Sequence, residues 1–244
     1  VPITPEPATA VPTEQSTDVP TEEPSPEPTT APGAPICRDW LVNGDFEGGP
    51  DVGWELVTSA TVGGRPMVLS DVIMKFVDVP DLTPMPESAE WFAFMGNGYN
   101  VEMSLLQKDP VDLLASDRVV SATLSFDLAL LTEEPVDGAT VDGLGIFVVD
   151  QNNVPLQVGA LTEETPGLIP GVWQKWNVNN VADLAATREG WETSRILLTS
   201  VQNGELLSQH LLDNVSMIVC ESATPLPPAV RARPGGGVPT WTVR

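Results

Sequence analysis

The sequence predicts an all-β fold of short antiparallel strands, either a sandwich or a barrel. Beyond the first 36 residues, apolar residues occur in short runs separated by Gly, Pro, Asn and Asp, a pattern typical of both architectures. Residues 123–130, TLSFDLAL, alternate between polar and apolar side chains, which places the four apolar ones on a single buried face of a strand. Almost no apolar residues recur at helical spacing, so strands make up nearly all of the predicted elements.

Nine strands and one short helix are predicted. Turn-forming pairs such as Asp137-Gly138 and Asn203-Gly204 separate several of the strands. The helix is expected near residues 180–188. The strands are expected at residues 40–46, 68–79, 90–95, 101–107, 119–131, 143–150, 173–178, 193–201 and 210–220.

Composition divides the chain into an extended Pro-rich N-terminal tail, a folded domain and a short irregular C-terminal tail. Residues 1–36 hold ten Pro, seven Thr and six acidic residues but no basic residue, too little apolar surface to fold alone. Residues 37–220 are the predicted β-domain. Residues 221–244 are rich in Pro, Gly and Arg, and they end in VPTWTVR. This last segment either extends as a strand along an available sheet edge or is a frayed terminus.

The charge distribution argues against nucleic acid and anionic membranes as partners. The net charge is −23, of which −6 falls in residues 1–36, −19 in residues 37–220 and +2 in residues 221–244. Phosphate backbones and anionic lipids repel such a chain. No apolar run approaches the about 20 residues that a membrane-spanning helix needs, so no transmembrane segment is expected.

The two cysteines lie at the two ends of the predicted domain. Cys37 precedes its first strand and Cys220 ends its last strand. A disulfide between them would tie these strands together and would indicate an oxidising compartment, extracellular or at the cell surface. Two buried free thiols are the alternative.

Several segments, taken in order along the chain, resemble the carbohydrate-binding-module, galactose-binding-like family of β-jelly-roll domains. Each motif is short, but the order of the motifs follows the family over nearly all of residues 40–219. The resemblance therefore implies that the predicted strands form an antiparallel β-sandwich of the jelly-roll type. The segments are LVNGDFE (41–47), GW (53–54), EWFAFMG (90–96), SLLQ (104–107), TLSFDLAL (123–130), WQKW (173–176) and LLDNVS (211–216).

Members of this family often hold a structural calcium ion between their first and last strands. The resemblance carries this role to Glu47 and Asp213. Carboxylate oxygens are ligands that Ca²⁺ prefers. The alternative is that both residues are solvated charges or turn formers.

Sugar binding would need exposed aromatic rings that stack on pyranose rings. The candidates are Trp91, Tyr99, Trp173 and Trp176. Because domains of this type usually bury their large aromatic residues, a position in the core is the favoured alternative for each. With one Tyr in the whole chain, the sequence is poor in the rings that such a role requires.

No catalytic motif is found, and the chain is not expected to be an enzyme. The single histidine, His210, lies near Ser208 and Asp213 in sequence only, and such local clustering does not give triad geometry. Zinc-binding spacings and phosphate-binding Gly loops are absent from the sequence. Apart from a structural calcium ion, no cofactor is expected.

The N-terminal tail resembles an O-glycosylated stalk, because its threonines lie among prolines. A plain linker is the alternative. The threonines concerned are Thr4, Thr9, Thr13, Thr17, Thr21, Thr29 and Thr30.

Two hypotheses of function follow. In the first, the chain is a non-catalytic extracellular structural protein that assembles with copies of itself into a filament, sheath or cell-surface layer. Its tails would dock on neighbouring subunits, since head-to-tail contacts that do not close generate filaments. In the second, the chain is a secreted or cell-surface carbohydrate-binding module on a glycosylated stalk, with glycans as its partners.

Overall fold

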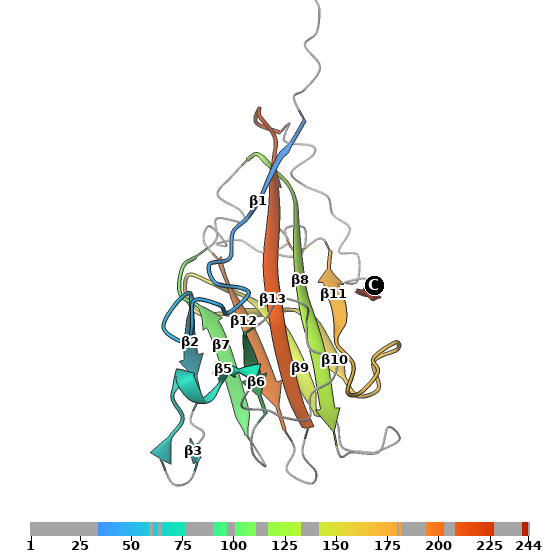
Figure 1. Ribbon diagram of the computed structural model, residues 1–244. Coiled ribbons are helices and arrows are strands. Elements are labelled where there is room, and N and C mark those ends of the chain that lie inside the picture. Colours follow the sequence, from blue (N-terminus) through green and yellow to red (C-terminus); the bar gives the residue numbers. More distant parts are fainter. Residues whose placement is uncertain are drawn as a thin grey trace, which may run out of the picture. The chain divides into compact units, whose positions relative to one another are not determined.

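The chain forms a β-sandwich in the computed structural model, drawn in Figure 1. The structure describes residues 34–58, 61, 62, 65–76, 90–96, 101–110, 117–132, 142–179, 181, 194–202, 208–226 and 241–243. Of the helix predicted near residues 180–188, only Val181 belongs to the described residues. Within this part of the chain, no helix has the length and apolar character of a membrane span.

The described strands form two main antiparallel sheets, which confirms the predicted all-β sandwich. Sheet A has the order β14-β11-β8-β13-β6-β5, and β1 also pairs with β13. Sheet B has the order β10-β9-β12-β7-β2, and β3 and β4 form a small hairpin. The strands of sheet A are β1 (Ile36–Asp39), β5 (Ile73–Lys75), β6 (Trp91–Met95), β8 (Val119–Thr132), β11 (Gln174–Val178), β13 (Ser208–Glu221) and β14 (Trp241–Val243). The others are β2 (Trp54–Val57), β3 (Thr61–Val62), β4 (Arg65–Pro66), β7 (Glu102–Gln107), β9 (Gly143–Asp150), β10 (Pro155–Thr162) and β12 (Ser194–Val201).

The main core lies between the two sheets. Alternate residues of each strand point inward, as the pleat of a strand requires. The alternation predicted for residues 123–130 is confirmed, because its four apolar side chains are fully buried. Trp54 and Trp176 are the largest fully buried side chains of this core. Burying one such apolar side chain contributes about 1.5–3 kcal/mol.

The prediction of a strand at residues 40–46 is wrong, because the chain forms a turn there. Asn43 and Phe46 have φ angles of 55° and 58°, in the left-handed region that interrupts a strand. The Asn43 side chain holds the turn, since its Nδ2 donates to the carbonyls of Gly49 and Val52 at 3.2 and 3.0 Å. The first strand is β1, which ends just before this loop.

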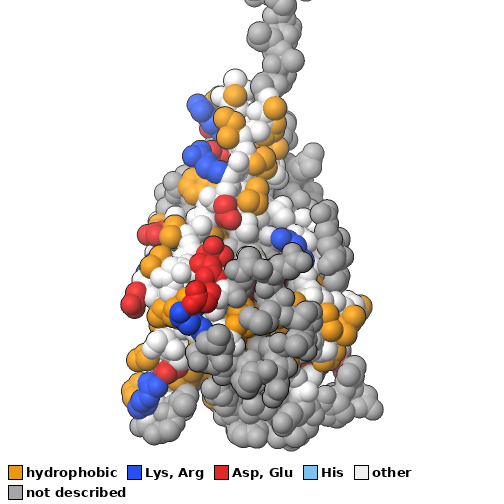
Figure 2. Space-filling model, viewed as in Figure 1, with side chains coloured by type: hydrophobic (Ala, Val, Ile, Leu, Met, Phe, Trp, Pro, Cys, Tyr) orange, Lys and Arg blue, Asp and Glu red, His pale blue; other side chains and the backbone are white. Residues whose placement is uncertain are grey.

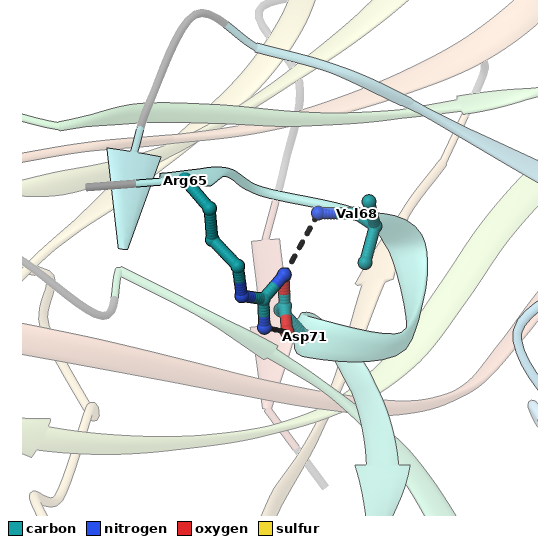
Figure 3. Close-up of polar contacts among 3 residues, drawn as sticks. All are labelled: Arg65, Val68 and Asp71. Carbon is teal, nitrogen blue, oxygen red and sulfur yellow. Dashed lines mark hydrogen bonds and ion pairs between the residues drawn. The ribbon is translucent and has the colours of Figure 1, made fainter. Parts of the chain in front are cut away.

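The strand predicted at residues 68–79 is interrupted by a short 3₁₀ helix, η1 (Leu69–Asp71). Figure 3 shows its cause. Asp71 accepts hydrogen bonds from Arg65 Nη1 and from the backbone N–H of Val68, both at 2.9 Å. The hydrogen bond from Arg65 is the main reason why the pKa of Asp71 lies below its ordinary value. The hydrogen bond from Val68 lowers this pKa further. The side chain therefore caps the turn, and β5 begins only after it.

Five of the described strands, β1, β2, β3, β4 and β10, were not predicted. β2 has four residues and follows a Gly-rich turn, so its apolar pattern is too short to recognise. β10 begins at Pro155 and contains a bulge between Gln157 and Gly159. Pro and Gly are both depleted in strand interiors, which explains why this segment was passed over.

Both ends of the domain are tied to sheet A. The predicted disulfide between Cys37 and Cys220 is confirmed, with a sulfur–sulfur distance of 2.07 Å. It joins directly opposed residues of β1 and β13. The C-terminal segment forms β14, whose Trp241 and Val243 lie opposite Val178 and Trp176 of β11.

Candidate functional site

The outer face of sheet B carries a continuous row of side chains across all five strands. Strand register places the five residues directly opposite one another, in the order Glu55, Leu106, Leu197, Phe147 and Gln157. Their chain neighbours Leu105, Ile146 and Leu198 belong to the core, so by alternation the row points away from it. We call these five residues the outer row.

Phe147 is the aromatic member of the outer row, and its ring leans along the strand. A Cβ atom at Gly145, two residues away, would lie 2.6 Å from Cε2 and 3.0 Å from Cζ of this ring. The glycine therefore leaves the space that the ring occupies. Phe147 and Leu197 remain partly exposed, whereas Leu106, beside Leu197, is buried.

Groups able to form hydrogen bonds lie at both ends of the outer row. Glu55 and Gln157 end the row, and Gln157 is exposed. Beside the row, Arg195 Nη1 donates to Glu55 Oε1 at 3.0 Å, and Arg195 Nη2 donates to Asn153 Oδ1. The row thus has an apolar centre flanked by a guanidinium, a carboxylate and an amide. This combination suits a ligand with both apolar faces and hydroxyl groups.

The aromatic residues proposed from the sequence lie elsewhere. Trp176 is fully buried in the core, so its ring is not available to a sugar. Trp173 is partly buried against the smaller apolar cluster on sheet A, edge-on to Phe76 at a centroid distance of 5.8 Å. Trp91 is partly buried, with Lys75 Nζ 5.0 Å from its ring centroid. Tyr99 lies outside the described residues, and the other three do not form one exposed aromatic surface.

The two residues proposed for calcium lie in an acidic cluster on the outer face of sheet A. Asp213 of β13 has no exposed surface, and its Oδ2 has no hydrogen-bond partner. Burial, first, and then the charges of Asp127, Glu47 and Asp45 raise the pKa of Asp213 to about 7, while the hydrogen bond from the N–H of Asn214 opposes the rise. Acidic side chains gather at the middle of this face in Figure 2.

Glu47 connects the loop at residues 40–53 to sheet A. Its Oε1 accepts hydrogen bonds from the backbone N–H groups of Glu90 and Trp91, at 2.6 and 3.1 Å. Asn214 extends the cluster, since its Nδ2 donates to Asp127 Oδ2 at 2.9 Å. The loop thus places two carboxylates, those of Asp45 and Glu47, near the carboxylates of β8 and β13.

This donor set suits a hard cation, because a buried carboxylate oxygen without a partner is costly unless a positive charge or a proton satisfies it. Among the described residues, however, no three acidic, histidine or cysteine side chains converge on one point. A calcium ion here would therefore need backbone carbonyl oxygens or water as further ligands, which Ca²⁺ accepts readily.

His210 and Asp213 point to opposite sides of sheet A. His210 faces inward, where burial lowers its pKa to about 4 and Ser200 Oγ lies 3.0 Å from its Nδ1. Ser208 Oγ instead donates to Glu163 Oε1 at 3.0 Å. The Ser, His and Asp that are close in sequence are therefore not joined in a triad.

Comparisons with known proteins concern the fold of this chain. No protein-family model matches it, and no curated protein matches it in sequence. Many solved structures match its fold. They include carbohydrate-binding modules and lectins.

Three of these structures show how low the sequence identities are. A structure of carbohydrate-binding modules from the β-sandwich superfamily is 11% identical, with 71% of this chain and 60% of that chain covered and a TM-score of 0.41. Winged bean acidic lectin, complexed with methyl-α-D-galactose, is 12% identical, with 77% and 99% covered and a TM-score of 0.44. A family 30 carbohydrate-binding module of a cellulosomal cellulase of Clostridium thermocellum is 11% identical, with 67% and 90% covered and a TM-score of 0.42.

The outer row could not have been found from the sequence. Its five members come from five strands, and two of those strands, β2 and β10, were not predicted. Phe147 itself lies in β9, whose bounds were predicted correctly. The GLGIF pattern around Gly145 was the one available signal, because a glycine two residues before an aromatic residue lets the ring lean over it.

Proposed function

We propose that this chain is a non-catalytic, extracellular glycan-binding protein and that the glycan lies across the outer row of sheet B. The observation that carries the proposal is the row itself, in which a partly exposed Phe147 and Leu197 lie between Glu55 and Gln157. Carbohydrates combine apolar ring faces with hydroxyl groups, and sites that bind them pair aromatic rings with a few polar groups.

The charge of the domain indicates a neutral glycan. Residues 37–220 carry a net charge of −19, which repels polyanionic polysaccharides. The basic group beside the row, Arg195, is already paired with Glu55. The chemistry of the row therefore favours uncharged sugars.

Titration against a panel of neutral and acidic oligosaccharides tests the proposal. Phe147→Ala should weaken binding of a neutral ligand about tenfold or more, since losing an apolar contact of about 1.4 kcal/mol has that effect. Gly145→Ala should weaken it too, because the added Cβ would displace the ring. Ile169→Ala is the control, because Ile169 is exposed and lies in a loop rather than in the outer row. Equal affinity of all three variants and the wild type would refute the site.

The disulfide and the N-terminal tail support an extracellular location for the protein. A structural disulfide between Cys37 and Cys220 supports an oxidising, extracellular compartment. The threonines of the N-terminal tail are proposed to carry O-linked glycans, which would make the tail a stalk. Mass spectrometry of the secreted protein, before and after removal of O-glycans, would detect this modification.

A calcium ion held by Asp213 and Glu47 is proposed as a structural element of this domain. The ion would supply positive charge to the buried Oδ2 of Asp213. A thermal melt in CaCl₂ should then show a higher Tm than one in EDTA, and MgCl₂ should have a smaller effect. Asp213→Asn should abolish the difference, whereas Asp51→Asn, an exposed acid, should retain it. An unchanged Tm on adding calcium would contradict the proposal.

Self-assembly is a second candidate function, and the pairing of β14 with β11 favours it. The edge of β11 accepts a short C-terminal strand by antiparallel pairing, and the same edge would accept the C-terminal strand of a neighbouring copy. A filament, sheath or cell-surface layer would result if such contacts did not close. Electron microscopy of concentrated protein, compared with a chain ending at residue 226, would reveal assemblies that depend on this strand. Monodisperse particles in both cases would exclude this route.

A further inference from the structure

The disulfide joins the point where the chain enters the domain to the point where it leaves. Cys37 is the second residue of β1, the first strand, and Cys220 is the second-last residue of β13. The two residues lie directly opposite each other in the sheet, although 183 positions separate them in sequence. The chain from Cys37 to Cys220 is therefore a closed covalent loop whose two ends meet at one point.

This attachment point lies at one end of the sandwich. Figure 1 shows β1, β8 and β13 converging at the end where β1 begins and β13 finishes. Side chains there are exposed, with Ile36 at 65% and Val120 at 48%, because sheet B does not cover this end. The chain on either side of the disulfide thus starts from one place on the surface of the domain.

We propose that the Cys37–Cys220 disulfide makes the chain a tension-bearing tether whose folded domain lies outside the path of the force. A pull along the chain enters at residue 36, crosses the sulfur–sulfur bond and leaves at residue 221. The 182 residues between the cysteines carry none of the load. This function does not depend on whether the domain binds a glycan.

Without the bond, the same pull would act on weak contacts. β1 has four residues and pairs only with β13 in the described structure. Beyond the hydrogen bonds between backbone groups, two side-chain contacts link the two strands: the ion pair between Arg38 and Glu221, at 2.6 Å, and the hydrogen bond from Met217 N to Asp39 Oδ1, at 3.0 Å. Arg38 is largely exposed, and exposed ion pairs contribute about 0–1 kcal/mol. The covalent bond is therefore the element that protects the domain from being unfolded from its N-terminal strand.

The contacts that follow Cys220 would release only a short length of chain. Ser222 N donates to Arg118 O at 2.8 Å, Leu226 N donates to Asp117 O at 2.9 Å, and β14 pairs with β11. Residues 221–243 would lengthen the chain by about 8 nm when these contacts break, at about 0.34 nm per residue. This small step should occur with or without the disulfide.

Single-molecule force spectroscopy of the full chain, held at Val1 and Arg244, tests the proposal. In the oxidised protein we expect steps no longer than about 8 nm. After reduction, and in the Cys37→Ser, Cys220→Ser double variant, we expect an added lengthening of about 60 nm as residues 37–220 unfold. A lengthening of about 60 nm in the oxidised protein would overturn the proposal. The absence of this lengthening from both reduced and oxidised chains would overturn it as well.

A second arrangement keeps the test valid if the reduced protein does not fold. An azide-bearing residue in place of Ile169, which is 54% exposed, allows the oxidised protein to be held at residue 169 and at Val1. The force then crosses the domain, and the shorter arm of the loop, from residue 169 to residue 220, sets the lengthening at about 17 nm. A step of about 17 nm in this arrangement, and no such step when the oxidised protein is held at Val1 and Arg244, supports the proposal. A lengthening of about 45 nm, the length of the arm from residue 37 to residue 169, would show that the bridge does not carry the load.

Discussion

At the scale of single residues, the most unusual group is the carboxylate of Asp213. It lies on the outer face of sheet A with no exposed surface. Burial and three neighbouring carboxylates raise its pKa to about 7. A group in this state either holds a proton near neutral pH or is satisfied by a cation. The same residue is therefore expected to respond to pH and, under the calcium proposal, to the metal as well.

In buffer with EDTA, Asp213 should make folding less favourable as pH rises from about 4 to about 7. The folded carboxyl keeps its proton up to about pH 7, whereas the unfolded one loses it near 3.8, so this stabilisation is full below pH 4 and lost above pH 7. The slope from one group is at most about 1.4 kcal/mol per pH unit. Urea denaturation across this range measures it.

The Asp213→Asn variant isolates this effect. His210 has the opposite effect on stability, because its pKa falls from 6.5 to about 4 on folding. Its contribution to the free energy of unfolding is therefore lost as pH falls. The difference between wild type and Asp213→Asn removes the histidine from the comparison. That difference should shift in favour of the variant as pH rises. A constant difference between the two proteins across this pH range would contradict the assignment.

Sequence reasoning named Asp213 and Glu47, whose calcium-binding role stays a prediction, and did not name Phe147. The first two were carried over from the resemblance of the short segments at residues 41–47 and 211–216. Phe147 belongs to a row that exists only through strand register, which no local pattern encodes. The predicted aromatic candidates were chosen by residue type, and type alone does not separate Trp176, in the core, from a residue on the surface.

At the scale of elements, the loop at residues 40–53 and the bulge in β13 are built against each other. The register of β13 against β8 shifts between Asp213 and Ser216, and Asn214 has a φ of 49°. Val215 N donates to Gly44 O at 2.8 Å. This contact fixes the loop on the sheet and so places Glu47 near Asp213.

Gly44→Ala should disrupt this contact. The added Cβ would lie 1.7 Å from the carbonyl oxygen of Val215, a clash with backbone that only a shift of the loop relieves. We expect a loss of about 3 kcal/mol in the free energy of unfolding. Gly49→Ala is the matched control, since Gly49 has a φ of 77° and open space around it, and should cost about 1 kcal/mol. Equal losses would show that the contact at Gly44 does not matter.

Long strands were predictable, while short or irregular ones were not. β8 and β9 alternate regularly, so their bounds follow from the sequence nearly to the residue. The loop at residues 40–46 has a strand-like pattern, but the hydrogen bonds of Asn43 favour a turn. Side chains that bond to the backbone compete with strand pairing in this way.

At the scale of the whole molecule, one covalent bond closes the domain. The chain between Cys37 and Cys220 forms a loop with a sequence separation of 183. Such a loop restricts the unfolded chain strongly and brings both ends of the domain to one place. Stability and the direction of mechanical load therefore depend on the same bond.

Removing the disulfide should lower the free energy of unfolding by up to about 5 kcal/mol, the loop-entropy value for a loop of this length. The Cys37→Ser, Cys220→Ser double variant and the reduced wild type should agree, because the chain has no other cysteine. Guanidinium denaturation with and without reductant measures the loss. A change below about 1 kcal/mol would show that the closed loop contributes little in this protein.

The proposal that the outer row binds a glycan is tested most directly by NMR. The isotope-labelled protein would be titrated with the neutral oligosaccharide that binds best in the panel. The account predicts that the ring protons of Phe147 and the amides of Leu197 and Leu106 shift first. Shifts confined to Trp91 and Trp173, with Phe147 unchanged, would place the ligand on sheet A and contradict the account.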